Sequence, residues 1–378
     1  MRYLHEAKGW PHLPWQVDSL IAPLSAVRYQ QGLLLGKMHA LGYPLQNEAT
    51  LAALTEETVK SSAIEGAALN PESVRSSLAR RMGLSVAGAP PADRHIEGIV
   101  EMMLDATQNS TAPLTDERLF GWHGALFSSG RSGIHKIRTG AWREGGMQVV
   151  SGAEGNEKVH FEAPVAEHVG QEMATFLAWF NSGEGIEPLI EAGLAHLYFV
   201  TIHPFADGNG RIARAITEMS LARLENSPQR FYSMSSQIRE ERRSYYEILE
   251  NTQKGGMDVT DWLTWFLACL GSAVEKANML TGSILEKEAF WRRLKRESMV
   301  LSDRQKKMVN LLLDGFEGKL TTEKWAKLTK SSHDTALRDI QGLIDKRILK
   351  QEKGGGEKHG LLSCDPRGGC LNQTLCAG

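Results

Sequence analysis

The sequence is poor in cysteine, and its few cysteines are unevenly placed. Of the four, only Cys269 lies in the main body, while Cys364, Cys370 and Cys376 lie in the final segment, residues 354–378. A framework of disulfide bonds is therefore excluded as the source of stability. The three late cysteines also lack the paired Cys-x₂₋₄-Cys spacing of structural zinc sites, so we expect a flexible tail there rather than a metal site.

Long apolar runs and a charge excess of either sign are missing as well. The apolar stretches are too short and too interrupted to cross a bilayer, and the first residues lack the apolar core of a signal peptide. The formal net charge is −2, so a general attraction to nucleic acid or to an anionic membrane is not expected. These absences predict a cytoplasmic protein without a membrane partner. Its 378 residues are enough for two or three domains.

One stretch, HPFADGNGRIAR at residues 203–214, holds most of the reactive groups. Apolar runs on both sides predict a helix before it and another after it, with the reactive groups in the loop between them. Gly208 and Gly210 allow backbone N–H groups to converge at the start of the second helix, where anions bind. Arg211 and Arg214 are three residues apart, so both can reach phosphate oxygens.

The same stretch also supplies a metal ligand and a base. The carboxylate of Asp207 suits Mg²⁺, which would be held mainly by phosphates and water. His203 is the natural general base, because the ordinary pKa of histidine lies near neutrality. A histidine at a helix end and a polar loop with capping glycines would be the purely structural alternative. Since packing alone does not require all of these groups together, we favour a Mg-polyphosphate site beside a proton acceptor.

Residues 203–214 match, position for position, the signature H-P-F-x-D-G-N-G-R-x-x-R, and the sequence therefore resembles Fic-domain proteins. The resemblance implies a mainly helical core and the transfer of AMP from Mg-ATP to a Ser, Thr or Tyr hydroxyl of a target protein. The roles that it implies are deprotonation of the hydroxyl by His203, anchoring of the loop by Phe205, Mg²⁺ binding by Asp207, α-phosphate binding by Asn209 with the amides of Gly208 and Gly210, and binding of the outer phosphates by Arg211 and Arg214.

Residues 47–66 predict a helix that begins at a cap, Asn47 or Thr50, and ends at Gly66. Ser61 and Glu65 are four residues apart and so lie on one face of it. An acid near a helix C-terminus is mildly unfavourable. It therefore indicates a cation nearby, unless the helix end is simply solvated.

Residues 61–66, SSAIEG, resemble the Fic inhibitory motif [S/T]-x-x-x-E-[G/N]. The resemblance implies that Glu65 pairs with Arg214, displaces the γ-phosphate of ATP and inhibits the enzyme in cis. Removal of AMP from a modified target, with Glu65 positioning water, is a second activity of the family. The sequence does not separate the two directions.

Two β-prone runs, at residues 147–152 and 159–161, surround a polar turn at residues 153–158 and predict a hairpin. The structural alternative is a surface hairpin that closes a core. The resemblance implies a flap that pairs with an extended segment of the target, with Val149, Val150 and Ser151 as the docking residues. It also implies an aromatic contact to adenine, for which Tyr246 is the candidate; a tyrosine that fills the core is the alternative.

The predicted architecture is mainly helical with that one hairpin. We expect an N-terminal helical region at residues 1–110 with the inhibitory helix at about 50–66, a Fic catalytic domain at 111–285, and a tail at 354–378. Residues 296–353 resemble a winged helix-turn-helix, with three short helices and a β-prone run. Residues 303–353 hold twelve Lys and Arg against eight Asp and Glu, a net charge of +4, which is only modestly basic.

Three alternatives remain open at this point. The winged helix either binds DNA or serves as a docking module that builds a homodimer. The whole chain is either an enzyme or a DNA-binding regulator whose Fic domain only senses a nucleotide. Finally, a group other than AMP could be transferred, although the intact Gly208 and Arg214 favour AMP.

Overall fold

The computed structural model describes residues 3–84, 93–151, 158–183, 185–313, 316, 320–351 and 361–363. Most of the predicted loop at residues 83–91 and of the hairpin turn at 153–158 lies outside these ranges, as do Cys364, Cys370 and Cys376. Among the helices that the structure describes, none is both long and apolar enough to span a membrane.

Over the described residues the fold is mainly helical with three small antiparallel strand pairs, which confirms the predicted fold class. The helices are η1 (Leu4–Glu6), α1 (Val17–His39), α2 (Tyr43–Ile64), α3 (Pro71–Arg81), α4 (Arg94–Gln108), α5 (Asp116–Leu126), α6 (Ala166–Ser182), α7 (Pro188–Ile202), α8 (Asn209–Glu225), α9 (Met234–Glu240), α10 (Arg242–Lys254), α11 (Thr260–Arg296), α12 (Asp303–Leu313), α13 (Thr322–Thr329) and α14 (His333–Asp345). The strand pairs are β1 (Arg131–Ser132) with β2 (His135–Lys136), β3 (Gln148–Ser151) with β4 (Lys158–Glu162), and β5 (Leu349–Gln351) with β6 (Leu361–Ser363).

The chain divides into two compact units, residues 1–278 and 279–378, and the boundary falls within α11. The sequence left open whether residues 275–296 form a helix or a linker. The structure shows one continuous helix from Thr260 to Arg296. Each unit is described by itself below.

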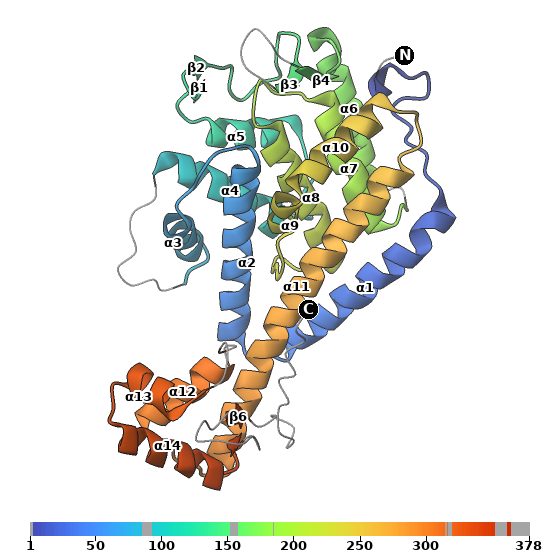
Figure 1. The fold of residues 1–378 in the computed structure, drawn as a ribbon. Helices are drawn as coiled ribbons and strands as arrows, with labels where there is room; N and C mark the ends of the chain where they lie inside the picture. The colour runs from blue at the N-terminus through green and yellow to red at the C-terminus, as the bar shows by residue number, and fades with distance from the viewer. Residues whose placement is uncertain are drawn as a thin grey trace. The chain divides into compact units, whose positions relative to one another are not determined.

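The centre of the N-terminal unit is the pair α7 and α8, which pack against each other (Figure 1). Every residue of α7 from Ala192 to Ile202 is buried, as expected for a helix that is apolar on all sides. α8 is buried from Arg211 to Ala222. The short loop that joins them is therefore held at both ends by buried helices.

Helix α2 begins earlier than the sequence suggested. Neither Asn47 nor Thr50 caps it, because the helix already starts at Tyr43 behind Gly42, with Pro44 in the first turn. Proline suits that position, where its missing N–H is not needed and its φ is already helical. The helix still ends where expected, at Ile64 and Glu65.

A buried carboxylate holds α2 against the start of α9. Glu57 is 2% exposed and accepts hydrogen bonds from the Ser233 hydroxyl at 2.8 Å and from the Ser235 N–H at 2.9 Å, as well as from the Ser235 hydroxyl. Hydrogen bonds to an ionised acceptor are stronger than those between neutral groups. Glu57 thus fixes the middle of α2, two turns before Glu65.

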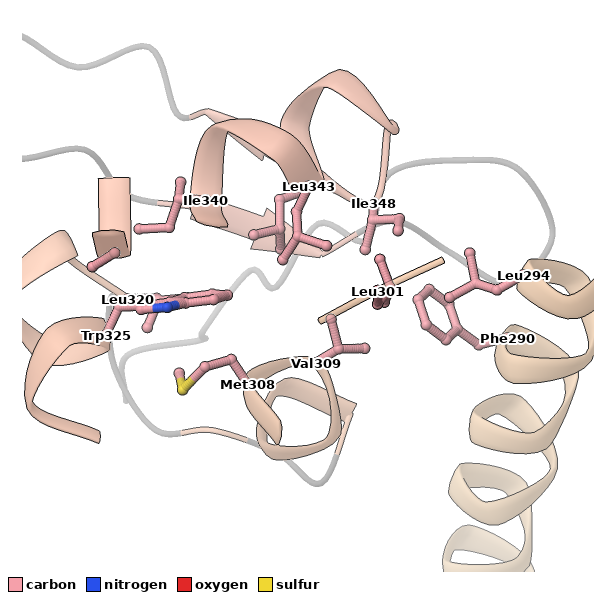
Figure 2. Close-up of a cluster of buried hydrophobic side chains, with 12 residues drawn as sticks. Phe290, Leu294, Leu301, Met308, Val309, Leu320, Trp325, Ile340, Leu343 and Ile348 are labelled. Carbon is pink, nitrogen blue, oxygen red and sulfur yellow. The ribbon is translucent and has the colours of Figure 1, made fainter. Parts of the chain in front are cut away.

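The C-terminal unit has a hydrophobic core of its own. Figure 2 shows a continuous cluster of apolar side chains from α11, α12, α13, α14 and the segments between them, and the fully buried Trp325 is one of its members. The helices α12, α13 and α14 lie where the sequence predicted three short helices, and β5 lies in the predicted β-prone run. The winged helix-turn-helix itself stays a prediction. The members of this core are Phe290, Leu294, Leu301, Met308, Val309, Leu320, Trp325, Ala336, Ile340, Leu343, Ile348 and Leu349.

We expect Trp325→Ala to lower the free energy of unfolding of the C-terminal unit by about 3–5 kcal/mol, because it leaves a large cavity. Leu337 lies on α14 and is 45% exposed, so the control Leu337→Ala should change that free energy by less than about 0.5 kcal/mol. Urea denaturation of the full chain, monitored by limited proteolysis, measures the free energy of unfolding of both variants. Equal effects of the two variants would contradict the core as described.

Candidate active site

The loop between α7 and α8 is held in shape by its own side chains. The amide of Asn209 accepts a hydrogen bond from the Phe205 N–H at 2.9 Å and donates one to the Phe205 carbonyl at 2.8 Å. The ring of Phe205 is fully buried and stacks on His123 at 4.2 Å. Gly208, with φ +82°, makes the turn into α8. The Asn209 side chain is therefore occupied within the loop.

His203 caps the C-terminal end of α7 in the left-handed conformation, with φ +52°. Its Nδ1 lies 3.1 Å from the Val200 carbonyl. A carbonyl oxygen only accepts, so Nδ1 carries the proton and Nε2 is the atom left to take up another. Burial lowers the pKa of His203, although the Val200 carbonyl, Glu65 and Asp207 oppose this effect. The imidazole is thus neutral near physiological pH.

Asp207 lies in the loop between α7 and α8, and its side chain is 42% exposed. One carboxylate oxygen accepts a hydrogen bond from the Gly208 N–H at 2.5 Å, and the other accepts one from the hydroxyl of Ser132 in β1. The same carboxylate faces a cavity of about 740 Å³. The cavity is lined by Glu65, Gly66, Ala67, Asp93, Arg94, His95, Leu126, Phe127, Ser128, Ser129, Arg131, Ser132, Gly133, Asp207 and Arg211.

Arg211 also lines this cavity and is 6% exposed. Its guanidinium lies 4.9 Å above the ring of Phe127 and 3.8 Å from the Asp207 carboxylate. Its Nε is buried and has no hydrogen-bond partner among the described residues. Because buried donors are normally paired, this nitrogen is suited to an anion that enters the cavity.

Arg214 lies one turn further along α8 and is 2% exposed. Its guanidinium forms hydrogen bonds and an ion pair with residues of α2. Its Nε donates to the Ser61 hydroxyl at 2.8 Å, and its Nη2 donates at 2.8 Å to both the Ser61 carbonyl and the Glu65 carboxylate. Although burial opposes the charged form, the nearby Glu65 carboxylate raises the pKa of Arg214. The structure therefore brings Ser61, Glu65 and Arg214 together as the sequence suggested.

Gly210 makes room for this ion pair. A Cβ atom built on Gly210 would lie 2.1 Å from Glu65 Oε1, far inside van der Waals contact. The Glu65 carboxylate thus rests directly on the first turn of α8. Any side chain at position 210 would compete with it for space.

The predicted base contact and flap residues lie in less enclosed places. Tyr246 is 37% exposed, and its hydroxyl lies 3.5 Å from the Ile64 carbonyl at the end of α2. The hairpin forms as expected, with an irregular register between Val149 and Val150. Val150 is 47% exposed, and Ser151 Oγ lies 2.5 Å from His160 Nε2 in β4. Their contacts with ligands stay predictions.

Three residues of the site were missed by the sequence analysis: His123, Ser132 and Arg143. His123 accepts a hydrogen bond from the Gly140 N–H at 3.0 Å, and burial lowers its pKa to about 4, so the ring stays neutral. Arg143 is 5% exposed and donates to the His203 carbonyl at 2.8 Å. All three act through tertiary contacts, so no local sequence pattern marks them.

The site fits a magnesium-bound polyphosphate. The described part of the chain contains no group of three or more His, Cys, Asp or Glu side chains that could hold a metal ion. A divalent cation at Asp207 would therefore take its other ligands from phosphate oxygens and water, as Mg²⁺ commonly does. Arg211, with its unpaired Nε, lines the same cavity as Asp207 and lies in the first turn of α8, whose N-terminus suits phosphates.

Comparisons with known proteins agree with this geometry. Residues 113–221 match the model of the Fic/DOC family, and residues 3–84 match the model "Domain of unknown function (DUF4172)". The chain therefore carries a Fic/DOC-family domain preceded by an N-terminal domain of that second type.

Curated relatives match over short segments. "Protein adenylyltransferase Fic" of Nematostella vectensis is 31% identical over 116 residues, which are 30% of this chain and 25% of that protein. "Protein adenylyltransferase fic-1" of Caenorhabditis briggsae is 40% identical over 63 residues, 16% of this chain and 12% of that protein. The matched segments thus span a quarter or less of these relatives.

Solved structures show the same fold. A Fic family protein from Desulfovibrio desulfuricans G20 matches with a TM-score of 0.50 and 20% identity over 93% of this chain and 98% of that chain. A Fic domain containing signaling protein from Bacteroides thetaiotaomicron matches with a TM-score of 0.52 and 21% identity over 68% of this chain and 95% of that chain. At these identities the likeness concerns the fold alone.

We expect Gly210→Ala to lower the free energy of unfolding by about 1–3 kcal/mol, because the new methyl group forces Glu65 away from Arg214. In a Glu65→Ala background the same change should cost at least about 1 kcal/mol less, since the clash is gone. Denaturant titrations of the four proteins of this cycle measure the coupling. Gly121→Ala is the control: its Cβ meets nothing within 4 Å and should be neutral or stabilising. Additive effects of the two changes would contradict the described contact.

Proposed function

We propose that the chain is a protein adenylyltransferase that transfers AMP from Mg-ATP to a Ser, Thr or Tyr hydroxyl of a target protein. The observation that carries the proposal is the set of reactive groups at the loop of residues 203–208. It presents a neutral imidazole and a half-exposed carboxylate beside the buried, unpaired Nε of Arg211. The names of the curated relatives support the same activity.

In the proposed reaction, Nε2 of His203 takes the proton of the target hydroxyl. The hydroxyl oxygen then forms a bond to the α-phosphorus, and the bond between that phosphorus and the bridging oxygen to the β-phosphate breaks, so that pyrophosphate leaves. General-base help of this kind commonly contributes about 10²–10⁴ in rate. When bound at Asp207, Mg²⁺ would supply positive charge that stabilises the phosphates.

Contacts to the phosphates come from α8 and its first turn. Because the Asn209 amide is tied to the backbone of Phe205, we assign its contribution to the backbone N–H, together with that of Gly210. The Gly208 N–H already donates to the Asp207 carboxylate, so Gly208 contributes the turn that lets α8 begin there. Such a set of N–H groups at a helix N-terminus favours anions. Arg211 and Arg214 hold the outer phosphates, and Tyr246 lies against the base.

The flap is the proposed docking site for the target. In an antiparallel strand addition, the target's backbone would pair with β3 at Val149, Val150 and Ser151. Backbone pairing positions the chain without demanding a particular side-chain sequence. This suits an enzyme whose acceptor is a hydroxyl on an extended segment.

Glu65 is the proposed inhibitor of the same site. Its carboxylate accepts a hydrogen bond from Nη2 of Arg214, the group that would otherwise hold the γ-phosphate. Glu65 also lines the cavity that the phosphates would enter. ATP bound beside it would lack the contact that aligns the leaving group. Removal of AMP from a target, with Glu65 positioning a water molecule, is compatible with the same arrangement.

The C-terminal unit is proposed as a winged-helix module, with DNA or a second copy of the chain as its partner. The exposed face of α14 carries His333 and Arg338 but also Asp334 and Asp345. This mixture of charges favours neither partner. The alternative function, a DNA-binding regulator that only senses a nucleotide, predicts DNA binding without any transfer of AMP.

We expect Glu65→Gly to raise self-labelling by α-labelled ATP and Mg²⁺ at least about tenfold over wild type, because Arg214 is then free to bind the γ-phosphate. The gain corresponds to about 1.4 kcal/mol. Adding His203→Ala should lower the rate again by about 10²–10⁴. Labelled protein and released pyrophosphate measure both effects.

Glu48→Gly is the matched control, because it also removes a helix α2 carboxylate from an ion pair, here with Arg75 at 2.6 Å. It should leave labelling at the wild-type level. Equal labelling of wild type and Glu65→Gly would refute inhibition by Glu65. Persistent labelling after His203→Ala would refute the role of His203 as the base.

The rate should stay high as the pH falls through 6.5. Burial lowers the pKa of His203 below the ordinary value of 6.5, so the neutral, proton-accepting form persists at pH values where an exposed histidine is mostly protonated. The pH profile of self-labelling by the Glu65→Gly protein, at constant ionic strength, measures this. A half-maximal rate at or above pH 6.5 on the acid side would contradict the half-buried, neutral base.

A further inference from the structure

Arg143 lies just before the flap, and its side chain donates hydrogen bonds to several backbone carbonyls near the candidate base. Its Nε donates to the His203 carbonyl at 2.8 Å, and its Nη1 donates to the Gly145 carbonyl at 2.8 Å. Its Nη2 donates to the Pro164 carbonyl and, at 3.5 Å, to the Ile202 carbonyl. The backbone N–H of Arg143 donates to the Pro204 carbonyl at 2.9 Å.

These acceptors belong to two structures that the proposed reaction has to align. Ile202, His203 and Pro204 are the end of α7 and the start of the signature loop. Gly145 precedes the flap strand β3, and Pro164 follows the flap strand β4. One planar guanidinium therefore ties both ends of the hairpin to the residue that carries the imidazole.

The contacts also fit the backbone of His203. The last carbonyls of a helix have no partner within the helix, and a positively charged donor at that end is stabilised by the helix dipole. A left-handed conformation is unusual for a residue other than glycine and needs support from its surroundings. Arg143 supplies that support at His203, and it is 5% exposed, so water does not replace it.

We infer that Arg143 is a positioning residue that fixes the flap relative to His203, so that a hydroxyl on a strand paired with the flap reaches Nε2 of the imidazole. The inference rests on the proposed transfer of AMP to a protein. The positioning role affects two acceptors of AMP differently. A protein hydroxyl is placed by the flap, whereas a water molecule that attacks the same phosphorus is not.

The test compares Arg143→Lys with its parent in the Glu65→Gly full-length protein. Lysine keeps the charge but loses the forked geometry that reaches several carbonyls at once. With saturating α-labelled ATP and Mg²⁺, self-labelling of protein and release of free AMP to water are measured together. We expect the ratio of labelling to AMP release to fall by about tenfold, while the KM for ATP changes less than about twofold.

Arg138→Lys is the matched control. Arg138 lies in the same segment, and its side chain is 54% exposed and pairs with Glu144. The control should keep the parental ratio. A merely structural role of Arg143 would lower labelling and AMP release in equal proportion, and this result would overturn the inference.

Two further outcomes are also decisive. Thermal melting and gel filtration report whether the variants fold, and Arg143→Gln serves as a second variant of similar shape. Failure of both variants to fold would assign Arg143 to stability and overturn the positioning role. An absence of labelling in the Glu65→Gly parent itself would refute the proposed function instead, which keeps the two failures distinguishable.

Discussion

The burial of Arg214 is the constraint on which the rest of the site depends. A guanidinium that is 2% exposed has lost most of its hydration, and removing a charge from water costs several kcal/mol unless other groups replace the water. Here Ser61 and Glu65 replace it from α2. The end of α2 is therefore held where the charge of Arg214 requires an anion.

In the proposed function the contact between Arg214 and Glu65 is reversible, and the same constraint gives the physical reason. Arg214 needs an anion beside it but does not need a particular one, and a phosphate oxygen satisfies a guanidinium as well as a carboxylate does. Glu65 is partly exposed, with 32% of its side chain accessible. When the pair opens, water reaches the Glu65 carboxylate more easily than the Arg214 guanidinium, so the lost contact costs Glu65 less free energy. Gly210 leaves room for either occupant. In the proposed function, Glu65 and the γ-phosphate exclude each other, because both need the space beside Gly210 and the Nη2 donor of Arg214.

Local sequence predicted those parts of the site whose residues are close together in the chain. The signature loop, the end of α2 and the hairpin lie where the sequence placed them, because each is encoded by neighbours: glycines at the turn into α8, Gly66 after α2, and alternating β-prone residues around a polar turn. The predicted start of α2 was wrong, because the helix begins at Tyr43 with Pro44 in its first turn and not at the capping residues Asn47 or Thr50.

What the sequence did not predict are contacts between distant segments. His123 stacks on Phe205, Ser132 donates to Asp207, and Arg143 donates to the His203 carbonyl. None of these pairs has a fixed spacing in the chain, so no motif records them. The occupation of the Asn209 amide by Phe205 was missed for a related reason. A motif identifies a residue without showing which of its atoms remain available.

Helix α10 contacts both the end of α2 and the flap. Near its start, Arg242 donates to the Ile64 carbonyl at 2.9 Å, directly before Glu65, and its guanidinium lies 5.4 Å above the ring of Tyr246. Near its end, Glu250 lies 2.6 Å from His160 in the flap strand β4. Helix α10, which carries Tyr246, therefore contacts both the end of α2 next to Glu65 and the flap strand β4.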